Sequence, residues 1–309
     1  MTRRQIAFYT AFLAVLGAGW GFTQPMTKIA VSTGYQHFGL VFWQMVIGAV
    51  FMTVINTFRC KRLPIRRPYL WLYLLLALIG TIIPNTAGYQ AAVWLPSGVL
   101  SLLLSIVPMF AFPIALAMGL DRFSIRRMGG LASGLAGVLV LVVPGSDLSG
   151  SLPAFWIFVA LIAGLCYALE GNIVAKWGIL DLDAFQVLQG ASVTGALIIL
   201  PVAIATGQFI DPTPPLDAAQ MALLASSVVH VLVYSGYMWL VGRAGAVFAV
   251  QVSYLVTGFG LIWAKIILSE AYAPTLWIAL AMMFAGLYLV QPRPKAALAQ
   301  VDPISDTDS

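Results

Sequence analysis

Charged side chains are scarce in this sequence, and their scarcity excludes most classes of soluble protein. Asp, Glu, Lys and Arg make up 9% of the 309 residues, whereas hydrophobic residues make up 61%. A soluble domain of this size needs far more charge on its surface, so we expect an integral membrane protein. The net charge of +5 does not indicate a nucleic-acid partner, because the basic residues flank apolar segments, where they contact anionic lipid headgroups.

Cysteine pairs and catalytic motifs are also missing. Cys60 falls at the end of an apolar segment and Cys166 in the middle of another, so neither is placed in an oxidising loop. The sequence contains no Gly-rich phosphate loop, no His-Glu-x-x-His, no cysteine pair at metal-ligand spacing and no Gly-x-Ser-x-Gly. It also lacks a nucleotide-binding domain. We therefore expect no enzymatic activity, no cofactor, no metal site and no ATP hydrolysis.

Long apolar segments dominate the chain instead. Each is near the ~20 residues that a helix needs to cross the hydrocarbon core of a bilayer. We therefore predict an all-α fold of ten transmembrane helices with short loops. The ten segments are residues 6–27, 38–58, 70–94, 97–119, 125–144, 153–175, 184–206, 218–241, 245–267 and 274–291.

The basic residues alternate between the two sides of this array. Fourteen of the sixteen Lys and Arg residues fall at the N-terminus, in the even-numbered loops between the ten segments, or after the last segment. The two exceptions are Lys28 and Lys265. Positive charge stays on the cytoplasmic side. We therefore expect a multi-pass protein of the plasma (inner) membrane with both termini cytoplasmic. Residues 293–309 are rich in Ala, Asp, Ser and Pro and are expected to form a disordered cytoplasmic tail.

The second half of the chain repeats features of the first. A shift of 149 residues aligns Asp121 with Glu270, Leu131-Ala132 with Leu280-Ala281, and Ala136-Gly137 with Ala285-Gly286. Each half has five apolar segments, an odd number, so the second half enters the membrane from the opposite side. We predict two inverted five-helix repeats, residues 1–150 and 151–292. Such repeats form a central site that can open to either side, which indicates a transporter.

Several short motifs resemble those of the drug/metabolite transporter superfamily, specifically its EamA-type permeases. They are Trp20-Gly21-Phe22, the run from Trp94-Leu95-Pro96-Ser97 through Val107-Pro108 to Leu120-Asp121, Gly134 to Leu139, and Phe284 to Leu287. The resemblance covers residues 5 to about 292. It departs from the family at Asp121, where Glu is usual, and at Thr257, which replaces the equivalent of Pro108. The resemblance implies ten helices, a substrate held between the halves, and export of small metabolites.

Two ionisable residues lie inside apolar segments, where a charge is costly. They are Glu170 in segment 153–175 and His230 in segment 218–241. Such residues usually face the bundle interior or a wet cavity. In a functional interpretation, Glu170 contacts an amine or takes up a proton, and His230 contacts substrate or completes a proton relay. In a structural interpretation, each stabilises packing through a hydrogen bond to a neighbouring helix.

Other polar and aromatic side chains recur at helical spacing and so share single faces. In lipid such faces must point inward, where they line a cavity or join helices through hydrogen bonds. We interpret Ser97, Ser101 and Ser105 as packing residues. With Glu170 and His230, we predict that the substrate cavity is lined by Trp20, Thr23, Gln24, Asn85, Tyr89, Tyr234, Gln251, Tyr254 and Trp263.

Two further features have alternative interpretations. Gly130 and Gly134 form a close-packing face that could serve intramolecular packing or a homodimer, and we rank packing first. Lys265 lies near the end of segment 245–267, where its long side chain can reach the membrane interface; a salt bridge to Glu270 is the alternative.

The function that these observations favour is a secondary or facilitative carrier for a small metabolite such as an amino acid. We expect it to be an exporter that works by alternating access between the inverted repeats, with the lipid bilayer and a small molecule as its partners. Two alternatives are a membrane-embedded enzyme that uses Glu170 and His230, and a structural or lipid-handling membrane protein.

Overall fold

The computed structural model describes residues 3–120, 122–142, 153–244 and 252–290, and this part of the chain is helical without any strand. The first half contains α1 (Arg3–Ala30), α2 (His37–Phe58), α3 (Arg67–Ala77), the π-helical turn η1 (Leu78–Ile82), α4 (Ile83–Trp94), α5 (Ser97–Leu104), α6 (Val107–Ala117) and α7 (Ile125–Val142). The second contains α8 (Ala154–Trp177), α9 (Ala184–Ala205), α10 (Ala218–Ala244), α12 (Val252–Leu268) and α13 (Pro274–Val290).

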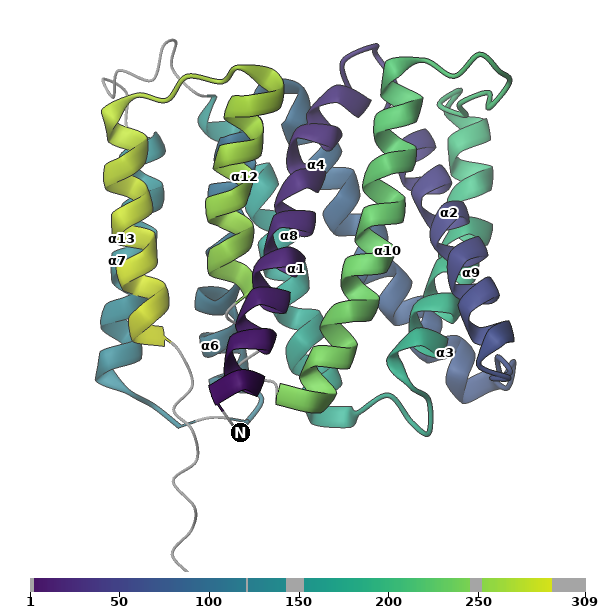
Figure 1. Cartoon of the computed structure of the whole chain (residues 1–309), viewed down its shortest axis with the longest axis horizontal. Helices are drawn as coiled ribbons and strands as arrows, with labels where there is room; N and C mark the ends of the chain where they lie inside the picture. The colour runs from purple at the N-terminus through teal and green to yellow at the C-terminus, as the bar shows by residue number, and fades with distance from the viewer. Residues whose placement is uncertain (1–2, 121, 143–152, 245–251, 291–309) are drawn as a thin grey trace, which may run out of the picture.

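The long helices stand side by side, as expected for a bundle that crosses a membrane (Figure 1). Within the described ranges, seven helical stretches are long and apolar enough to span a bilayer, and residues 252–268 and 274–286 form shorter apolar helices. The prediction of an all-helical, multi-pass membrane protein is therefore confirmed. The count of ten transmembrane helices stays a prediction.

Two of the spanning stretches are broken at a proline. Pro84 lies in the first turn of α4 and follows the π-helical turn η1, and Pro108 lies in the first turn of α6. Proline has no backbone N–H and disrupts the hydrogen bonding of the preceding turn. As a result, residues 67–94 form α3, η1 and α4 in succession, and residues 97–117 form α5 and α6.

The two halves interleave, because the main packing partners of each helix come from the other half. Helix α1 packs along α10 and α12, and its repeat equivalent α8 packs along α4 and α6. Helices α2 and α9, α5 and α12, and α7 and α13 pair equivalent elements across the halves. Figure 1 shows α7 beside α13 at one edge and α2 near α9 at the other. The packing scheme is unchanged when the halves are exchanged, as a twofold pseudo-symmetry requires.

Small residues allow the close approach of α1 to its partners. A Cβ atom at Gly21 would lie 2.8 Å from the backbone nitrogen of Gly260 in α12. A Cβ atom at Gly19 would lie 2.5 Å from a methyl carbon of Val233 in α10. Small residues at helix interfaces are typical of packing in membranes. Gly19 and Gly21 therefore let α1 pack closely against two helices of the second half, α10 and α12.

The face formed by Gly130 and Gly134 packs inside the chain. A Cβ atom at Gly286 of α13 would lie 2.9 Å from the Gly134 nitrogen, and the Ser133 hydroxyl donates to the Met282 carbonyl over 2.9 Å. This contact supports the packing interpretation of the glycines.

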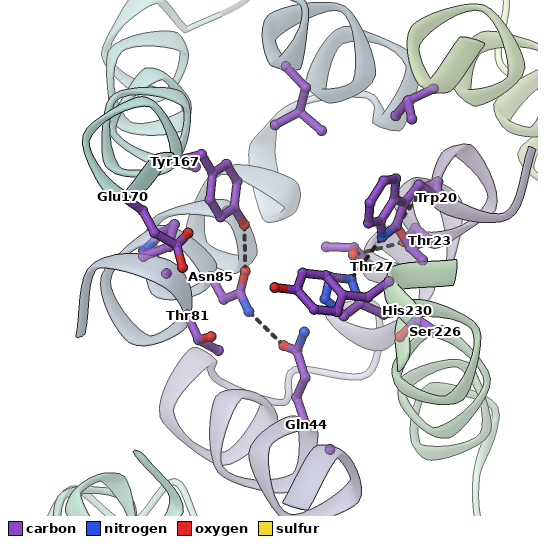
Figure 2. Close-up of a pocket in the computed structure, with 18 of the residues that line it drawn as sticks. Trp20, Thr23, Thr27, Gln44, Thr81, Asn85, Tyr167, Glu170, Ser226 and His230 are labelled. Carbon is purple, nitrogen blue, oxygen red and sulfur yellow. Dashed lines mark hydrogen bonds between the residues drawn. The ribbon is translucent and has the colours of Figure 1, made fainter. Parts of the chain in front are cut away.

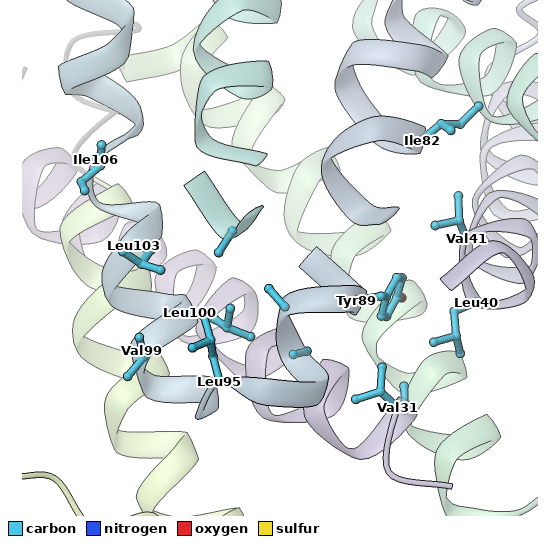
Figure 3. Close-up of a cluster of buried hydrophobic side chains, with 14 of the residues drawn as sticks. Val31, Leu40, Val41, Ile82, Tyr89, Leu95, Val99, Leu100, Leu103 and Ile106 are labelled. Atoms are coloured by element: carbon cyan, nitrogen blue, oxygen red, sulfur yellow. The ribbon is translucent and has the colours of Figure 1, made fainter. Parts of the chain in front are cut away.

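The elbow between α4 and α5 is held by charged groups from two other elements. The Lys28 ammonium of α1 donates to the carbonyl oxygens of Ala92, Val93 and Leu95 at 2.6–3.1 Å. Unpaired carbonyls end a helix and attract cations. Figure 3 shows the apolar side chains that pack around this elbow, including Leu95 and Val99. The elbow is thus held by buried apolar side chains and by the Lys28 ammonium.

Glu270, from the turn between α12 and α13, caps the other side of the same elbow. Its carboxylate accepts hydrogen bonds from the backbone nitrogens of Ser97 and Gly98 and from the Tyr272 hydroxyl. The alternative salt bridge between Lys265 and Glu270 does not form among the described residues. Lys265 is exposed at the end of α12, whereas Glu270 turns inward toward the unpaired N–H groups at the start of α5.

Candidate substrate cavity

A cavity of about 540 Å³ lies between the two halves of the bundle. It is lined by residues from α1, α2, α3, η1, α4, α5, α6, α8, α9, α10 and α12. Its volume falls in the range of roughly 300–1,000 Å³ that is typical of small-molecule sites. Figure 2 shows that its polar side chains gather on two facing walls.

The first wall is formed by α1 and α10 around a bond between Trp20 and His230. The indole Nε1 of Trp20 donates to Nδ1 of His230 over 3.2 Å. Because Nδ1 accepts, this imidazole is neutral and carries its proton on Nε2. The ring of Tyr234 is stacked on the imidazole with centroids 6.3 Å apart. This wall therefore offers aromatic surface and one N–H donor.

The same wall continues along α1 with two threonines whose hydroxyl groups donate to backbone carbonyls of α1 itself. The Thr23 hydroxyl donates to the Trp20 carbonyl, and the Thr27 hydroxyl donates to the Thr23 carbonyl. Their spacing of three and four residues places both on the face that carries Trp20. Each hydroxyl oxygen retains the capacity to accept a hydrogen bond from a bound molecule.

The second wall is a chain of hydrogen bonds that joins α8, α4 and α2. The Tyr167 hydroxyl donates to Oδ1 of Asn85 over 3.0 Å, and Nδ2 of Asn85 donates to Oε1 of Gln44 over 3.0 Å. The Tyr89 hydroxyl donates to the same Gln44 oxygen over 3.2 Å. Each of these bonds crosses between elements, so the chain fixes the relative position of three helices as well as the lining of the cavity.

Glu170 lies beside this chain, against the π-helical turn η1. A Cβ atom at Gly80 would lie 2.8 Å from Cδ and 3.0 Å from Oε2 of Glu170. In the described ranges, no side chain or backbone group donates a hydrogen bond to this carboxylate, and no cation pairs with it. Glu170 is therefore a cavity-lining acid without a partner in the part of the protein that the structure describes.

The predicted cavity residues divide into three groups. Trp20, Thr23, Gln24, Asn85, Tyr89, Glu170, His230 and Tyr234 all line the cavity. Gln251 lies outside the described residues. Tyr254 and Trp263 do not line the cavity. Trp263 of α12 donates to the Ala18 carbonyl of α1 over 3.0 Å, and Tyr254 packs edge-on against Phe284 of α13.

The two ionisable residues do not contact each other. Glu170 lies on the wall with Tyr167 and Asn85, and His230 lies on the facing wall with Trp20 (Figure 2). In this conformation the cavity separates them, so a proton cannot pass directly from one side chain to the other.

Several residues of the site were not predicted from the sequence, and three of them shape its second wall. Gln44 and Tyr167 belong to the hydrogen-bonded wall, and Gly80 makes the space for Glu170. Gln44 is a polar side chain in the middle of an apolar segment, which is a usable signal. Tyr167 precedes Glu170 by three residues and so shares its face. Gly80 gave no signal, because many glycines occur in these segments.

The serines of α5 have the packing role that was expected. Ser101 donates to the Ser97 carbonyl and Ser105 to the Leu102 carbonyl, and all three serines are fully buried. Thr257 of α12 donates to the Ser101 carbonyl over 3.3 Å. The Thr257 hydroxyl therefore joins α12 to α5 outside the cavity, whereas the hydroxyls of Ser101 and Ser105 donate within α5.

Comparisons with known proteins agree with this architecture. The chain is 22% identical over 280 residues to a probable terminal-alkyne amino-acid exporter of Streptantibioticus cattleyicolor, covering 89% of this chain and 90% of that protein. A solved crystal structure superposes with a TM-score of 0.62 at 17% identity, covering 92% of this chain and 96% of the other. That likeness concerns the fold alone.

The match to a known family follows the internal repeat. The EamA-like transporter family matches residues 7–143 and again residues 154–291, one match in each half. Together the two matches cover almost the whole described chain. The protein therefore belongs to the EamA-like transporter family.

Proposed function

We propose that this transporter exports a small metabolite such as an amino acid across the plasma (inner) membrane, as a secondary or facilitative carrier. The observation that carries the proposal is the cavity between the halves, where an unpaired carboxylate faces a neutral imidazole. The description of the Streptantibioticus relative as an amino-acid exporter supports the substrate class. An amino acid carries one cationic and one anionic group, which suits a cavity with different polar groups on its two walls.

Alternating access is the mechanism that the pseudo-symmetry supports. In this proposal, ten transmembrane helices form two inverted repeats, residues 1–150 and 151–292, with both termini cytoplasmic. Exchanging the conformations of the two repeats would close the cavity on one side and open it on the other. The lining residues Trp20, Asn85, Glu170 and His230 would then stay with the substrate throughout.

The test is transport by the purified protein in proteoliposomes, with a panel of amino acids, amines and organic acids. We expect saturable flux for at least one amino acid. The variant Gly88→Leu should abolish this flux, because Gly88 lines the cavity and a Cβ atom there meets nothing within 4 Å. The new side chain would fill the site without disturbing its walls.

The matched control is Gly129→Leu. Gly129 is exposed on α7, and a Cβ atom there also meets nothing within 4 Å. This variant introduces the same side chain into a helix but leaves the cavity unchanged, so flux should be retained. If no compound of the panel is transported and one of them is chemically converted, the carrier proposal fails and the alternative of a membrane-embedded enzyme is favoured.

A further inference from the structure

The described lining of the cavity contains an acidic side chain but no Lys or Arg. Glu170 is the only acidic residue among its described lining residues, and no Lys or Arg is among them. The Lys28 ammonium donates to the α4–α5 elbow, and the Lys176 ammonium at the end of α8 donates to the Met118 carbonyl. A purely anionic molecule would therefore meet no compensating charge in this site, but would meet a carboxylate.

An ionised carboxylate inside a bilayer is costly without a partner. Its desolvation is offset only when it is paired and hydrogen-bonded, or when it takes up a proton. The described part of the chain supplies no such partner to Glu170, although Asn85, Tyr167 and Gln44 alongside it are hydrogen-bonded in a chain. The partner is therefore expected to arrive with the transported molecule.

The local backbone keeps this position open. Gly80 belongs to the π-helical turn η1, and any side chain there would collide with the Glu170 carboxylate. Single π-helical turns within α-helices are frequent at functional sites. A turn that places a glycine directly against an unpaired acid leaves the carboxylate facing the cavity.

We propose that Glu170 is the counter-ion for an ammonium group of the transported molecule. This deepens the proposed function, on which it rests, by making a cationic amine the required feature of the substrate. The His230 Nε2–H on the facing wall is the donor for an acceptor group at the other end of the molecule. The aromatic rings of Trp20 and Tyr234 provide the apolar surface between them.

Three probes of matched size test the assignment: L-leucine, 3-methylbutylamine, which lacks the carboxylate, and 4-methylpentanoate, which lacks the ammonium. Binding to the purified full-length protein is measured as a concentration-dependent rise in melting temperature. We expect L-leucine and 3-methylbutylamine to bind and 4-methylpentanoate to bind at least about tenfold more weakly. Equal binding of 4-methylpentanoate, or no binding of either amine, would overturn the proposal.

Glu170→Gln should weaken binding of both amines at least about tenfold while leaving the ligand-free melting temperature near that of the parent protein. Gly80→Ala should weaken amine binding in the same direction by displacing the carboxylate. Its control, Gly129→Ala, adds the same methyl group to a glycine that is exposed on α7 outside the cavity lining, where the Cβ atom meets nothing within 4 Å. Retained amine binding by Glu170→Gln would refute the assignment.

Flux measurements separate this proposal from the proposed function. If Glu170→Gln transports with unchanged preference for amines but loses its dependence on an imposed pH gradient, Glu170 is a proton site and the ammonium assignment fails. Transport of some metabolite by the parent protein would still stand in that case. If the parent protein transports nothing, the proposed function itself fails.

Discussion

The Glu270 carboxylate lies 2.7 Å from the backbone nitrogen of Ser97, although 173 residues separate them in the sequence. This contact joins the turn between α12 and α13 to the first turn of α5. Lys28 holds the carbonyl end of α4 on the opposite side of the same elbow. Two charges of opposite sign therefore cap the two helices that meet at Leu95 and Pro96, each with the sign that the helix dipole favours.

Glu270→Gln should destabilise the protein by about 1–2 kcal/mol, because it removes charge-assisted hydrogen bonds to the first turn of α5. Thermal unfolding in detergent measures the change. The control is Lys265→Met, which removes an exposed cation five residues away that does not reach Glu270. A larger loss for Lys265→Met than for Glu270→Gln would contradict the observed capping contact.

Lys28→Met should also destabilise the protein, since it leaves the carbonyl oxygens of Ala92, Val93 and Leu95 without their donor. The cost of an unsatisfied buried acceptor is about 1–3 kcal/mol. Lys28→Arg keeps a charge and several donors, and it should recover part of the loss. Unfolding midpoints of the three proteins provide the test, and equal midpoints would show that the cap contributes nothing.

His230→Asn should separate the two contacts of the imidazole. The shorter amide oxygen can still accept from Trp20 in place of Nδ1, but nothing replaces the Nε2–H donor. We expect little change in the melting temperature and an increase of several-fold or more in the apparent KM for transport. His230→Ala should lose both contacts and be less stable. Unchanged kinetics in His230→Asn would restrict this residue to packing.

The stability of the protein should fall in acid through Asp183, which caps the first turn of α9. Burial alone would raise the pKa of Asp183, but hydrogen bonds from Arg59, Gln186 and Phe185 outweigh burial and lower the pKa below its ordinary value of 3.8. A depressed folded-state pKa gives stability that is present above pH 3.8 and is lost as the pH falls through the folded-state value.

This pH effect is checked by unfolding the parent protein and Asp183→Asn between about pH 7 and pH 3. The parent should be the more stable protein at neutral pH, and the difference should shrink toward the acid end. Arg59→Met, which removes the salt bridge of 2.8 Å, should reduce the difference at neutral pH. A gap that is independent of pH would show that the carboxylate charge is not responsible.

The helical bundle and several polar residues of the cavity lining could be predicted from the sequence for a definite physical reason. Polar side chains in lipid must face inward, so stripes such as Trp20 and Thr23, or Asn85 and Tyr89, are restricted to the interior by their spacing and polarity alone. The family resemblance carried by Trp20-Gly21-Phe22 and the segment after Trp94 was likewise confirmed by the match in each half.

Which inward-facing residues meet the cavity could not be predicted. Trp263 and Tyr254 also face inward, but the close approach of α12 to α1 brings the Trp263 indole against a carbonyl of α1, and Tyr254 meets Phe284. The spacing of residues predicts which side chains share a face of a helix, but it does not predict which other helix packs against that face. A salt bridge between Lys265 and Glu270 was one of two interpretations, and it does not form because the Glu270 carboxylate binds the unpaired N–H groups of α5 from the other half.

The interleaving of the two repeats limits how the protein can move. Because α1 is fixed against α10 and α12, and α8 against α4 and α6, neither repeat can swing as a separate rigid unit without tearing its tightest interfaces apart. In the proposed alternating-access cycle, each moving body would combine helices from both halves of the chain. It also follows that the first half of the chain leaves the ribosome before the helices that pack against it have been synthesised. Assembly is complete only after α12 and α13 have been synthesised.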